Sequence, residues 1–537
     1  MNRSCLLVLS LTALATLTGP SRTEAQVRLD ASGVAKRIDI FVEKKLREVK
    51  VTAAPRADDA EFLRRVHLDL TGRLPTLEKA AAFLDGKEPE RRAKLIDELL
   101  ASPEFGNHFA RYWTELFVKR DGELNSKMKT TEFRAWLAEQ FNKGVGWDQI
   151  VTKMLTVDDT SPAGFYLRAN RLNGDRPSPA KVVGTSAALF LGTQLQCAEC
   201  HNHPYTREWK QNDFWGLAAF YGRTRYENVA NSKTRETRIT EEDPPPPDPK
   251  AKNKKVVFLP KGGKIDIPDP LDAKKVRATV DAKLLDGSVP KLSETGPHRP
   301  HFARWLTDTK NEYFAQAAAN RLWAILFARG LVNPLDDLNP KNAPSHPELL
   351  ELLAEEFRVS GHDVRHVLRS ICLSDTYQRT SKRTPTDPED DNFSRMKVKF
   401  LQGEVLLKCL DQVLGAEPVV ATKKKRDDTS IGTAELFDTS VYDDNPANYS
   451  FGAPQMLRLM NVDVPRRAPA AIARLLQTPA EPAQCLEKLF LQSLARRPTA
   501  DESKMLLAHV AKAETPARGY EAVVWILLNS AEFVSHR

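Results

Sequence analysis

The chain has 537 residues, so it can bury a sizeable core and should form two or more domains. It carries 79 Lys and Arg against 71 Asp and Glu, a formal net charge of +8, and the basic residues are scattered among acidic ones. This charge favours solubility. Because no basic face is interleaved with aromatic side chains, we expect no nucleic-acid partner.

The first 25 residues have the pattern of an export signal. Arg3 supplies a positive start, residues 5–17 are apolar, and Thr23-Glu-Ala25 offers small residues for cleavage. The apolar run is too short to span a membrane, and no later segment has about 18 consecutive apolar residues. We therefore expect residues 1–25 to be a signal peptide. The mature chain should be exported, periplasmic or at the cell surface, with no integral membrane segment; an uncleaved N-terminal anchor is the alternative.

Residues 32–223 are expected to form a helical domain. Asp58 precedes apolar residues at four-residue spacing, and Gly72 ends that pattern. Thr76 opens a second helix, and a third covers residues 91–100. Aromatic residues then recur at helical spacing, which indicates packing in a core and not a ligand site.

Residues 224–297 differ in composition from the predicted helical segments before and after them. The four prolines from Pro244 to Pro247 lie among charges and predict a stiff, exposed linker. Two runs rich in β-branched residues, 255–259 and 264–267, flank a pair of glycines. This pattern predicts a small β-hairpin within the linker.

From Pro300 onwards the apolar spacing is helical again, and residues 298–535 are expected to form a second helical domain. The predicted fold class is therefore mainly α. Two helical domains, 32–223 and 298–535, are joined by a Pro-rich linker that carries a small β element.

The two ends of the chain share a sequence pattern. A similar hexapeptide occurs twice, as Leu100-Ala-Ser-Pro-Glu-Phe105 and as Leu528-Asn-Ser-Ala-Glu-Phe533. In each case a Pro-Thr pair, roughly 30 residues before the end of the hexapeptide, opens a helix. A duplication or a shared packing solution would both produce this echo. We expect residues 60–105 and 484–533 to superpose, and unrelated orders of helices in the two segments would contradict this.

The segment Cys197-Ala-Glu-Cys-His201 makes the sharpest chemical prediction. Its spacing is that of covalent haem c attachment, in which Cys197 and Cys200 bind the porphyrin and His201 is the proximal iron ligand. The export signal agrees with this prediction, because this haem is attached outside the cytoplasmic membrane. Either the iron is five-coordinate or a sixth ligand comes from elsewhere in the chain. The candidates for that ligand are Met128, Met154, His67 and His108.

Two other interpretations of the same segment stay open. Cys197, Cys200, His201 and His203 offer thiolate and imidazole ligands that suit zinc or iron. Four ligands within seven residues would strain a tetrahedral site, so we rank this metal site below haem. The third interpretation is a redox dithiol or a purely structural pair of cysteines.

The remaining cysteines and motifs add no second site. Cys372, Cys409 and Cys485 each lie alone in apolar, helix-like surroundings, so we expect them to be buried small hydrophobes. The sequence has no Gly-x-Ser-x-Gly elbow and no phosphate-binding glycine loop. No catalytic constellation is found outside the predicted haem site, and the sequence leaves open whether the protein is an enzyme.

Two long strings of residues resemble a known family. The stretches Glu61–Thr76 and Cys197–Tyr205, with Trp209, resemble the planctomycete-type cytochrome-c-like domain. Further on, Asn320-Arg-Leu-Trp323 and Ser345-His-Pro-Glu-Leu-Leu350 resemble the companion C-terminal domain that follows it in that family. The resemblance implies a cytochrome-like protein, and neither family has an assigned function.

The expected function follows from the motif, the export signal and the resemblance. We expect an exported c-type cytochrome-like protein that binds haem and exchanges electrons with a protein redox partner. One alternative is a non-redox scaffold or binding protein with a structural zinc or other metal site at Cys-x-x-Cys-His-x-His. Another is an exported redox enzyme of polysaccharide breakdown.

Overall fold

The structure is a computed structural model. It describes residues 29–119, 130–170, 178–204, 206, 209–229, 237–243, 263–269, 272, 275–383, 392–415, 456–457 and 459–537. The predicted signal peptide, the proline run and residues 255–259 lie outside the described residues.

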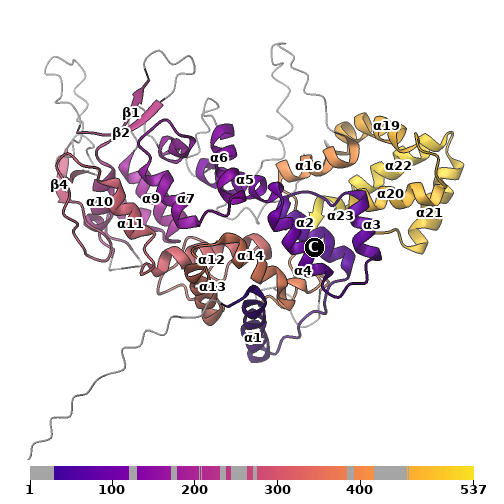
Figure 1. Ribbon diagram of the computed structural model, residues 1–537, viewed down its shortest axis with the longest axis horizontal. Helices are drawn as coiled ribbons and strands as arrows, with labels where there is room; N and C mark the ends of the chain where they lie inside the picture. The colour runs from indigo at the N-terminus through magenta and orange to yellow at the C-terminus, as the bar shows by residue number, and fades with distance from the viewer. Residues whose placement is uncertain are drawn as a thin grey trace, which may run out of the picture.

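The fold is mainly α-helical, as the sequence predicts, and its strands form only small antiparallel pairs (Figure 1). The helices before the strands are α1 (Ala31–Val49), α2 (Asp59–Thr71), α3 (Leu77–Asp85), α4 (Arg91–Ala101), α5 (Pro103–Lys119), α6 (Thr130–Asn142), α7 (Trp147–Thr156), α8 (Phe165–Ala169), α9 (Pro179–Phe190) and α10 (Gln211–Ala218). Short 3-10 turns are η1 (Pro162–Gly164), η2 (Leu195–Glu199) and η3 (Ala219–Tyr221).

A second run of helices follows the first four strands. It comprises α11 (Arg299–Leu306), α12 (Glu312–Phe327), α13 (Pro347–Val359), α14 (Val364–Leu373), α15 (Asp375–Gln378), α16 (Gly403–Leu414), α19 (Val464–Leu475), α20 (Pro482–Leu494), α21 (Ala500–Lys512), α22 (Pro516–Leu528) and α23 (Ala531–Val534). A π-helical turn, η5 (Leu459–Asp463), precedes α19.

Local signals set the ends of the first helices where the sequence predicts them. The Asp58 carboxylate accepts a hydrogen bond from the Glu61 N–H at the start of α2. The Thr76 hydroxyl accepts one from the Lys79 N–H at the start of α3. Gly72 ends α2 in the left-handed conformation, with φ of +63°.

Gly72→Ala should destabilise the protein by about 2–4 kcal/mol, because it adds strain to a left-handed residue and overpacks its surroundings. A Cβ at this position would lie 2.4 Å from Nδ1 of His108 on α5. Gly144→Ala is the matched control, since Gly144 has φ of +67° but nothing within 4 Å of the added carbon. Urea denaturation should show a loss of only about 1 kcal/mol for this control. Equal losses in the two variants would contradict the packing argument.

The described strands form three antiparallel pairs. Residues 224–297 contain β1 (Thr224–Asn228) with β2 (Thr237–Glu241), and β3 (Lys264–Pro268) with β4 (Val276–Asp281). The predicted strand 264–267 is therefore present, but its described partner is β4, and the expected partner 255–259 lies outside the described residues. The third pair joins β5 (Lys399–Phe400) to β6 (Ser535–His536), so the end of the chain is tied to its middle.

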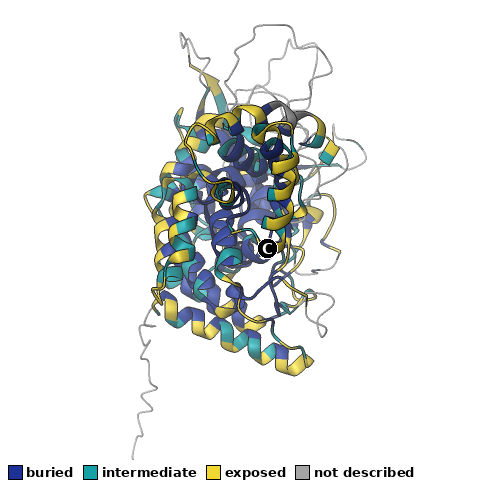
Figure 2. Ribbon diagram, turned by 90° about the vertical axis from the view of Figure 1, so that its right-hand side faces the viewer, coloured by how far each residue is buried: buried dark blue, intermediate teal, exposed yellow. Residues whose placement is uncertain are grey.

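The larger hydrophobic core draws side chains from both predicted helical domains. Helix α1 packs against α13 and α14, α4 packs against α14, and α9 packs against α12. The buried side chains of this core run from Val34 to Ala495 in the sequence. Figure 2 shows the buried helices inside a shell of half-exposed and exposed ones.

A smaller core joins the two segments that share a sequence pattern. Leu68 and Leu74 from the first segment pack with side chains of α16, α19, α20 and α22, and α3 contacts α20. The order of helices is the same in both segments: α2, α3 and α4 correspond to α20, α21 and α22. Ala495 ends α20 in the left-handed conformation, as Gly72 ends α2. The two segments therefore have related orders of helices, and their superposition stays a prediction.

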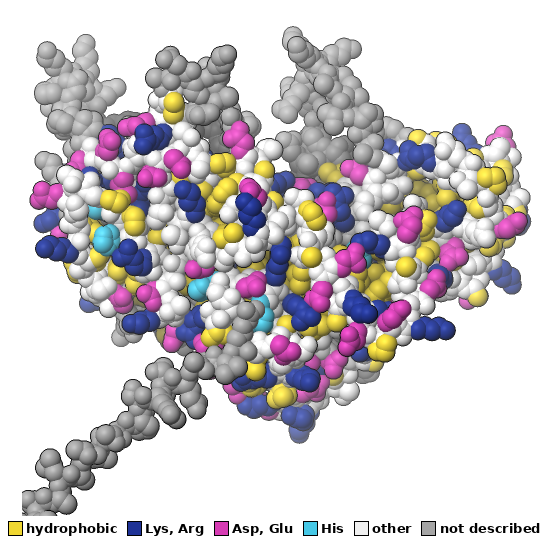
Figure 3. Space-filling view, in the orientation of Figure 1, with side chains coloured by type: hydrophobic (Ala, Val, Ile, Leu, Met, Phe, Trp, Pro, Cys, Tyr) yellow, Lys and Arg dark blue, Asp and Glu magenta, His cyan; other side chains and the backbone are white. Residues whose placement is uncertain are grey.

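The outer surface mixes both signs of charge. On the face in Figure 3, Lys and Arg side chains are interspersed with Asp and Glu. Within the described part of the chain, no helix is both long enough and apolar enough to cross a membrane.

Candidate functional site

The Cys-x-x-Cys-His segment starts on the 3-10 turn η2, between α9 and α10: Cys197 lies within the turn, Cys200 is its C-terminal cap, and His201 follows. Leu195 and Ala198 are fully buried and anchor the turn, whereas the free thiols of Cys197 and Cys200 are exposed. Both thiols are therefore accessible from outside, one within the turn and one at its C-terminal cap.

Helix α10 holds the backbone of this turn in place. Trp215 donates its indole N–H to the Glu199 carbonyl at 2.9 Å. The Gln211 side-chain amide donates to the carbonyls of Glu199 and Cys200, both at 3.0 Å. These bonds fix the peptide units on either side of Cys200, so the aromatic helix after the motif positions the thiol.

His201 is exposed, and its two ring nitrogens have different roles. Nδ1 lies 2.7 Å from the carbonyl oxygen of Asn202. A carbonyl only accepts hydrogen bonds, so Nδ1 carries the proton and Nε2 keeps its lone pair. Nε2 makes no hydrogen bond to a described residue and is available as a ligand. An Nδ1–H bond to a backbone carbonyl is also how proteins commonly orient a metal-binding histidine.

His203 is buried and both of its ring nitrogens are engaged. Nδ1 accepts the Thr206 N–H at 2.9 Å, and Nε2 donates to the Gln194 carbonyl at 3.2 Å. The ring also packs edge-on against Trp209, with centroids 5.3 Å apart. His203 thus closes the loop after the motif, and its lone pair is not directed to the thiols.

The described residues contain no group of three or more His, Cys, Asp or Glu side chains placed to hold a metal ion. The four-ligand set of Cys197, Cys200, His201 and His203 is accordingly not assembled in this structure. The other three cysteines, Cys372, Cys409 and Cys485, are buried as the sequence predicts.

The candidates for a sixth iron ligand do not lie together with the motif. His67 and His108 are on α2 and α5, in the middle of the molecule, whereas α9 and α10 are at its left end (Figure 1). Met154 is a fully buried core residue on α7, and Met128 lies outside the described residues. The structure therefore places neither His67 nor His108 beside the motif.

Two features of the site were missed by sequence reasoning. Gln211 and Trp215 hold the turn through side-chain bonds to its backbone, and no local pattern marks such long-range donors. Arg277 on β4 in turn donates to the Gln211 side chain at 3.0 Å, so the small sheet supports the motif from behind.

Comparison with known proteins gives two matches. Residues 37–226 match the family model described as PSCyt2, a protein of unknown function (DUF1549). Residues 298–426 match the one described as PSD1, a protein of unknown function (DUF1553). No curated protein and no solved structure matches the chain.

Proposed function

We propose that this chain, in which a PSCyt2 region (37–226) is followed by a PSD1 region (298–426), is an exported c-type cytochrome-like protein. Cys197 and Cys200 would hold haem c by thioether bonds, each thiol adding its sulfur and its hydrogen across a vinyl double bond. His201 would bind the iron. The haem would supply a one-electron redox centre at the surface.

The orientation of His201 is the observation that carries this proposal. Its Nδ1–H is bound to the Asn202 carbonyl, which leaves Nε2 pointing away from the backbone with a free lone pair. The two thiols lie on the exposed side of the turn beside it. Attachment therefore needs no unfolding of the buried anchors Leu195 and Ala198.

The zinc or iron alternative has weaker support than haem. It needs His203 as a fourth ligand, but both nitrogens of that ring already bond to Gln194 and Thr206. Recruiting His203 would break two buried hydrogen bonds and leave backbone groups unpaired, which costs about 1–3 kcal/mol for each group.

The proposal also includes export and a protein redox partner. Both rest on the first 25 residues and on the exposure of the motif. A haem tethered at an exposed turn can approach a second protein closely, as electron transfer requires. The polysaccharide-redox and scaffold alternatives have no observation at this segment that favours them.

We expect the double variant Cys197→Ala/Cys200→Ala to lose all covalently bound haem, because only these two thiols are exposed among the described cysteines. The measurement is the pyridine haemochrome spectrum after denaturation, on protein exported from a host that matures c-type cytochromes. Cys409→Ala, which removes a buried thiol, is the matched control and should retain the full spectrum.

A further variant separates the two histidines. His201→Ala should keep the covalent haem but change its absorption spectrum, because the proximal ligand is lost. His203→Ala should mainly lower stability. Colourless wild-type protein with one zinc ion per chain would overturn the proposal, as would unchanged haem content in the double cysteine variant.

A further inference from the structure

A separate cleft borders the motif segment. It has a volume of about 460 Å³, which lies within the range of ligand-binding pockets, about 300–1,000 Å³. Its walls come from distant parts of the chain: Thr193 follows α9, Trp209 precedes α10, Trp305 is on α11, and Tyr313 is on α12. Neither Cys197 nor Cys200 lines it.

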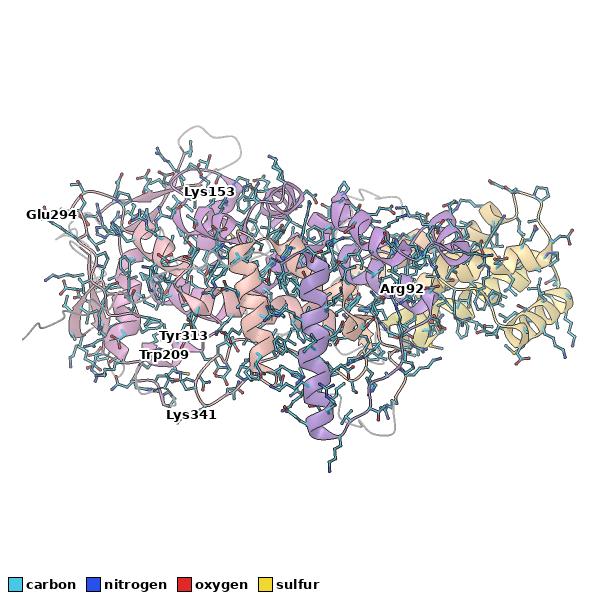
Figure 4. All side chains as sticks on the ribbon, turned by 60° about the horizontal axis from the view of Figure 1, so that its bottom comes forward. Arg92, Lys153, Trp209, Glu294, Tyr313 and Lys341 are labelled. Atoms are coloured by element: carbon cyan, nitrogen blue, oxygen red, sulfur yellow. The ribbon has the colours of Figure 1, made fainter. Side chains whose placement is uncertain are left out.

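Three aromatic side chains face this cleft. Trp209 and Trp305 are half-buried and Tyr313 is exposed, and Figure 4 shows Trp209 and Tyr313 near one another on one side of the molecule. Each Trp packs against another ring: Trp209 against His203 and Trp305 against Phe302, with ring centroids 5.3 Å and 5.9 Å apart. The remaining ring surface is rigid and apolar, and suits the C–H face of a flat ligand.

The deep end of the cleft holds a polar group without a partner. Thr193 is only 2% exposed, and its hydroxyl has no hydrogen-bond partner among the described residues. A buried hydroxyl left in this state is unfavourable. A ligand with its own hydroxyl group would satisfy it.

The rim carries both hydrogen-bond acceptors and donors. Asp286, Asp308 and Glu312 supply carboxylates, and Lys310 supplies an ammonium group. The Asp286 carboxylate accepts hydrogen bonds from Ser288, and the Asp308 carboxylate accepts one from the Lys310 N–H, so each keeps further acceptor capacity. The rim therefore has three negative charges against one positive charge, and it offers several acceptors to hydroxyl groups.

From these observations we infer that the cleft binds a neutral sugar ring. A sugar presents an apolar C–H face to the aromatic walls, and hydroxyl groups to Thr193 and the carboxylates. A quaternary ammonium ion would suit the rings and the carboxylates, but it has no group that can hydrogen-bond to Thr193. An acidic sugar would be repelled by the rim. The site goes beyond the proposed haem function and does not depend on it.

The test uses the full mature chain and isothermal titration calorimetry. The probes are glucose, N-acetylglucosamine and the β-1,4-linked disaccharides of each, with glucuronic acid and choline as the charged comparisons. We expect saturable binding of at least one neutral sugar and clearly weaker binding of both charged probes. Binding of choline or glucuronic acid alone, or of no neutral sugar, would overturn the inference.

Three variants locate the site. Tyr313→Ala should weaken sugar binding about tenfold or more. Trp525→Ala is the matched control, because Trp525 on α22 is 37% exposed and Tyr313 is 39% exposed, but only Tyr313 lines the cleft. Thr193→Val keeps the side-chain shape and should weaken binding about fivefold without lowering the melting temperature. Unchanged affinity in Tyr313→Ala or Thr193→Val would refute this placement, even if sugars bind elsewhere.

Discussion

The free energy of unfolding should fall steeply as the pH is lowered from about 6.5 to 4, because several histidines are buried in their neutral form. Burial lowers the pKa of His67 and of His346 to about 4. Burial, reinforced by the nearby charge of Arg111, lowers the pKa of His108 well below its ordinary value. Burial and the nearby charge of Lys399 likewise lower the pKa of His536 well below its ordinary value.

The sign of the effect follows from proton binding. Between pH 6.5 and 4 the unfolded chain protonates these histidines, whereas the folded chain does not, so the unfolded state binds more protons. Their contribution to stability is therefore complete above about pH 6.5 and is lost as the pH falls. A pKa that drops from 6.5 to about 4, as for His67, corresponds to about 3 kcal/mol at pH 4. Burial raises the pKa of Asp69, which acts in the opposite direction and offsets part of this loss.

Urea denaturation followed by circular dichroism at a series of pH values measures this slope. His67→Gln should flatten the pH dependence, since it removes one group that titrates differently in the two states. His509→Gln on α21 is the control, because His509 is exposed and should leave the slope unchanged. Stability that stays constant between pH 7 and 4.5, roughly the window in which unfolded histidines gain protons, would contradict the argument.

The parts of the fold that sequence reasoning predicted depend on contacts within a few residues. Asp58 and Thr76 cap N–H groups three positions away, and Gly72 supplies a left-handed end to its own helix. These signals are local, so they can be recognised without knowing what packs against the helix.

The parts that were not predicted depend on groups far apart in the sequence. His203 was a candidate ligand by spacing, but its burial is decided by Trp209 and by the Gln194 carbonyl. The described partner of the strand at 264–267 is β4, eight residues further on, and the expected partner 255–259 lies outside the described residues. The sugar-sized cleft needs Thr193 and Tyr313 to meet, and no residue pattern near either one indicates the other.

The largest single-site loss of stability is expected at a buried ion pair that links α2 to β5. Lys399 donates to Asp69 at 2.6 Å, and to the carbonyls of Ile325 and Leu326 at 3.0 and 2.8 Å, in the last turn of α12. The side chains of Asp69 and Lys399 are 3% and 6% exposed. Tyr377 donates its hydroxyl to the second Asp69 oxygen at 2.8 Å. One ammonium group thus neutralises a buried carboxylate and also donates hydrogen bonds to carbonyl groups at the C-terminal end of α12.

Lys399→Met should lower the free energy of unfolding by about 3–5 kcal/mol, because it leaves the buried Asp69 carboxylate without its ion-pair partner. Burial lowers the pKa of Lys399 and raises that of Asp69, so each side chain depends on the other to stay charged. The double variant Asp69→Leu/Lys399→Met should lose clearly less than the sum of the two single changes, since neither charge then remains unpaired.

An exposed ion pair provides the control for this comparison. Lys143 and Glu139 on α6 are joined at 2.5 Å, but their side chains are 62% and 55% exposed. Lys143→Met should therefore change the stability by no more than about 0.5 kcal/mol. If urea denaturation gave similar losses for Lys399→Met and Lys143→Met, Asp69 would have to be solvated or protonated in the folded protein. The same conclusion would follow if the loss in the double variant Asp69→Leu/Lys399→Met equalled the sum of the losses in the two single variants. Two independent side chains give additive losses, whereas a desolvated ion pair does not.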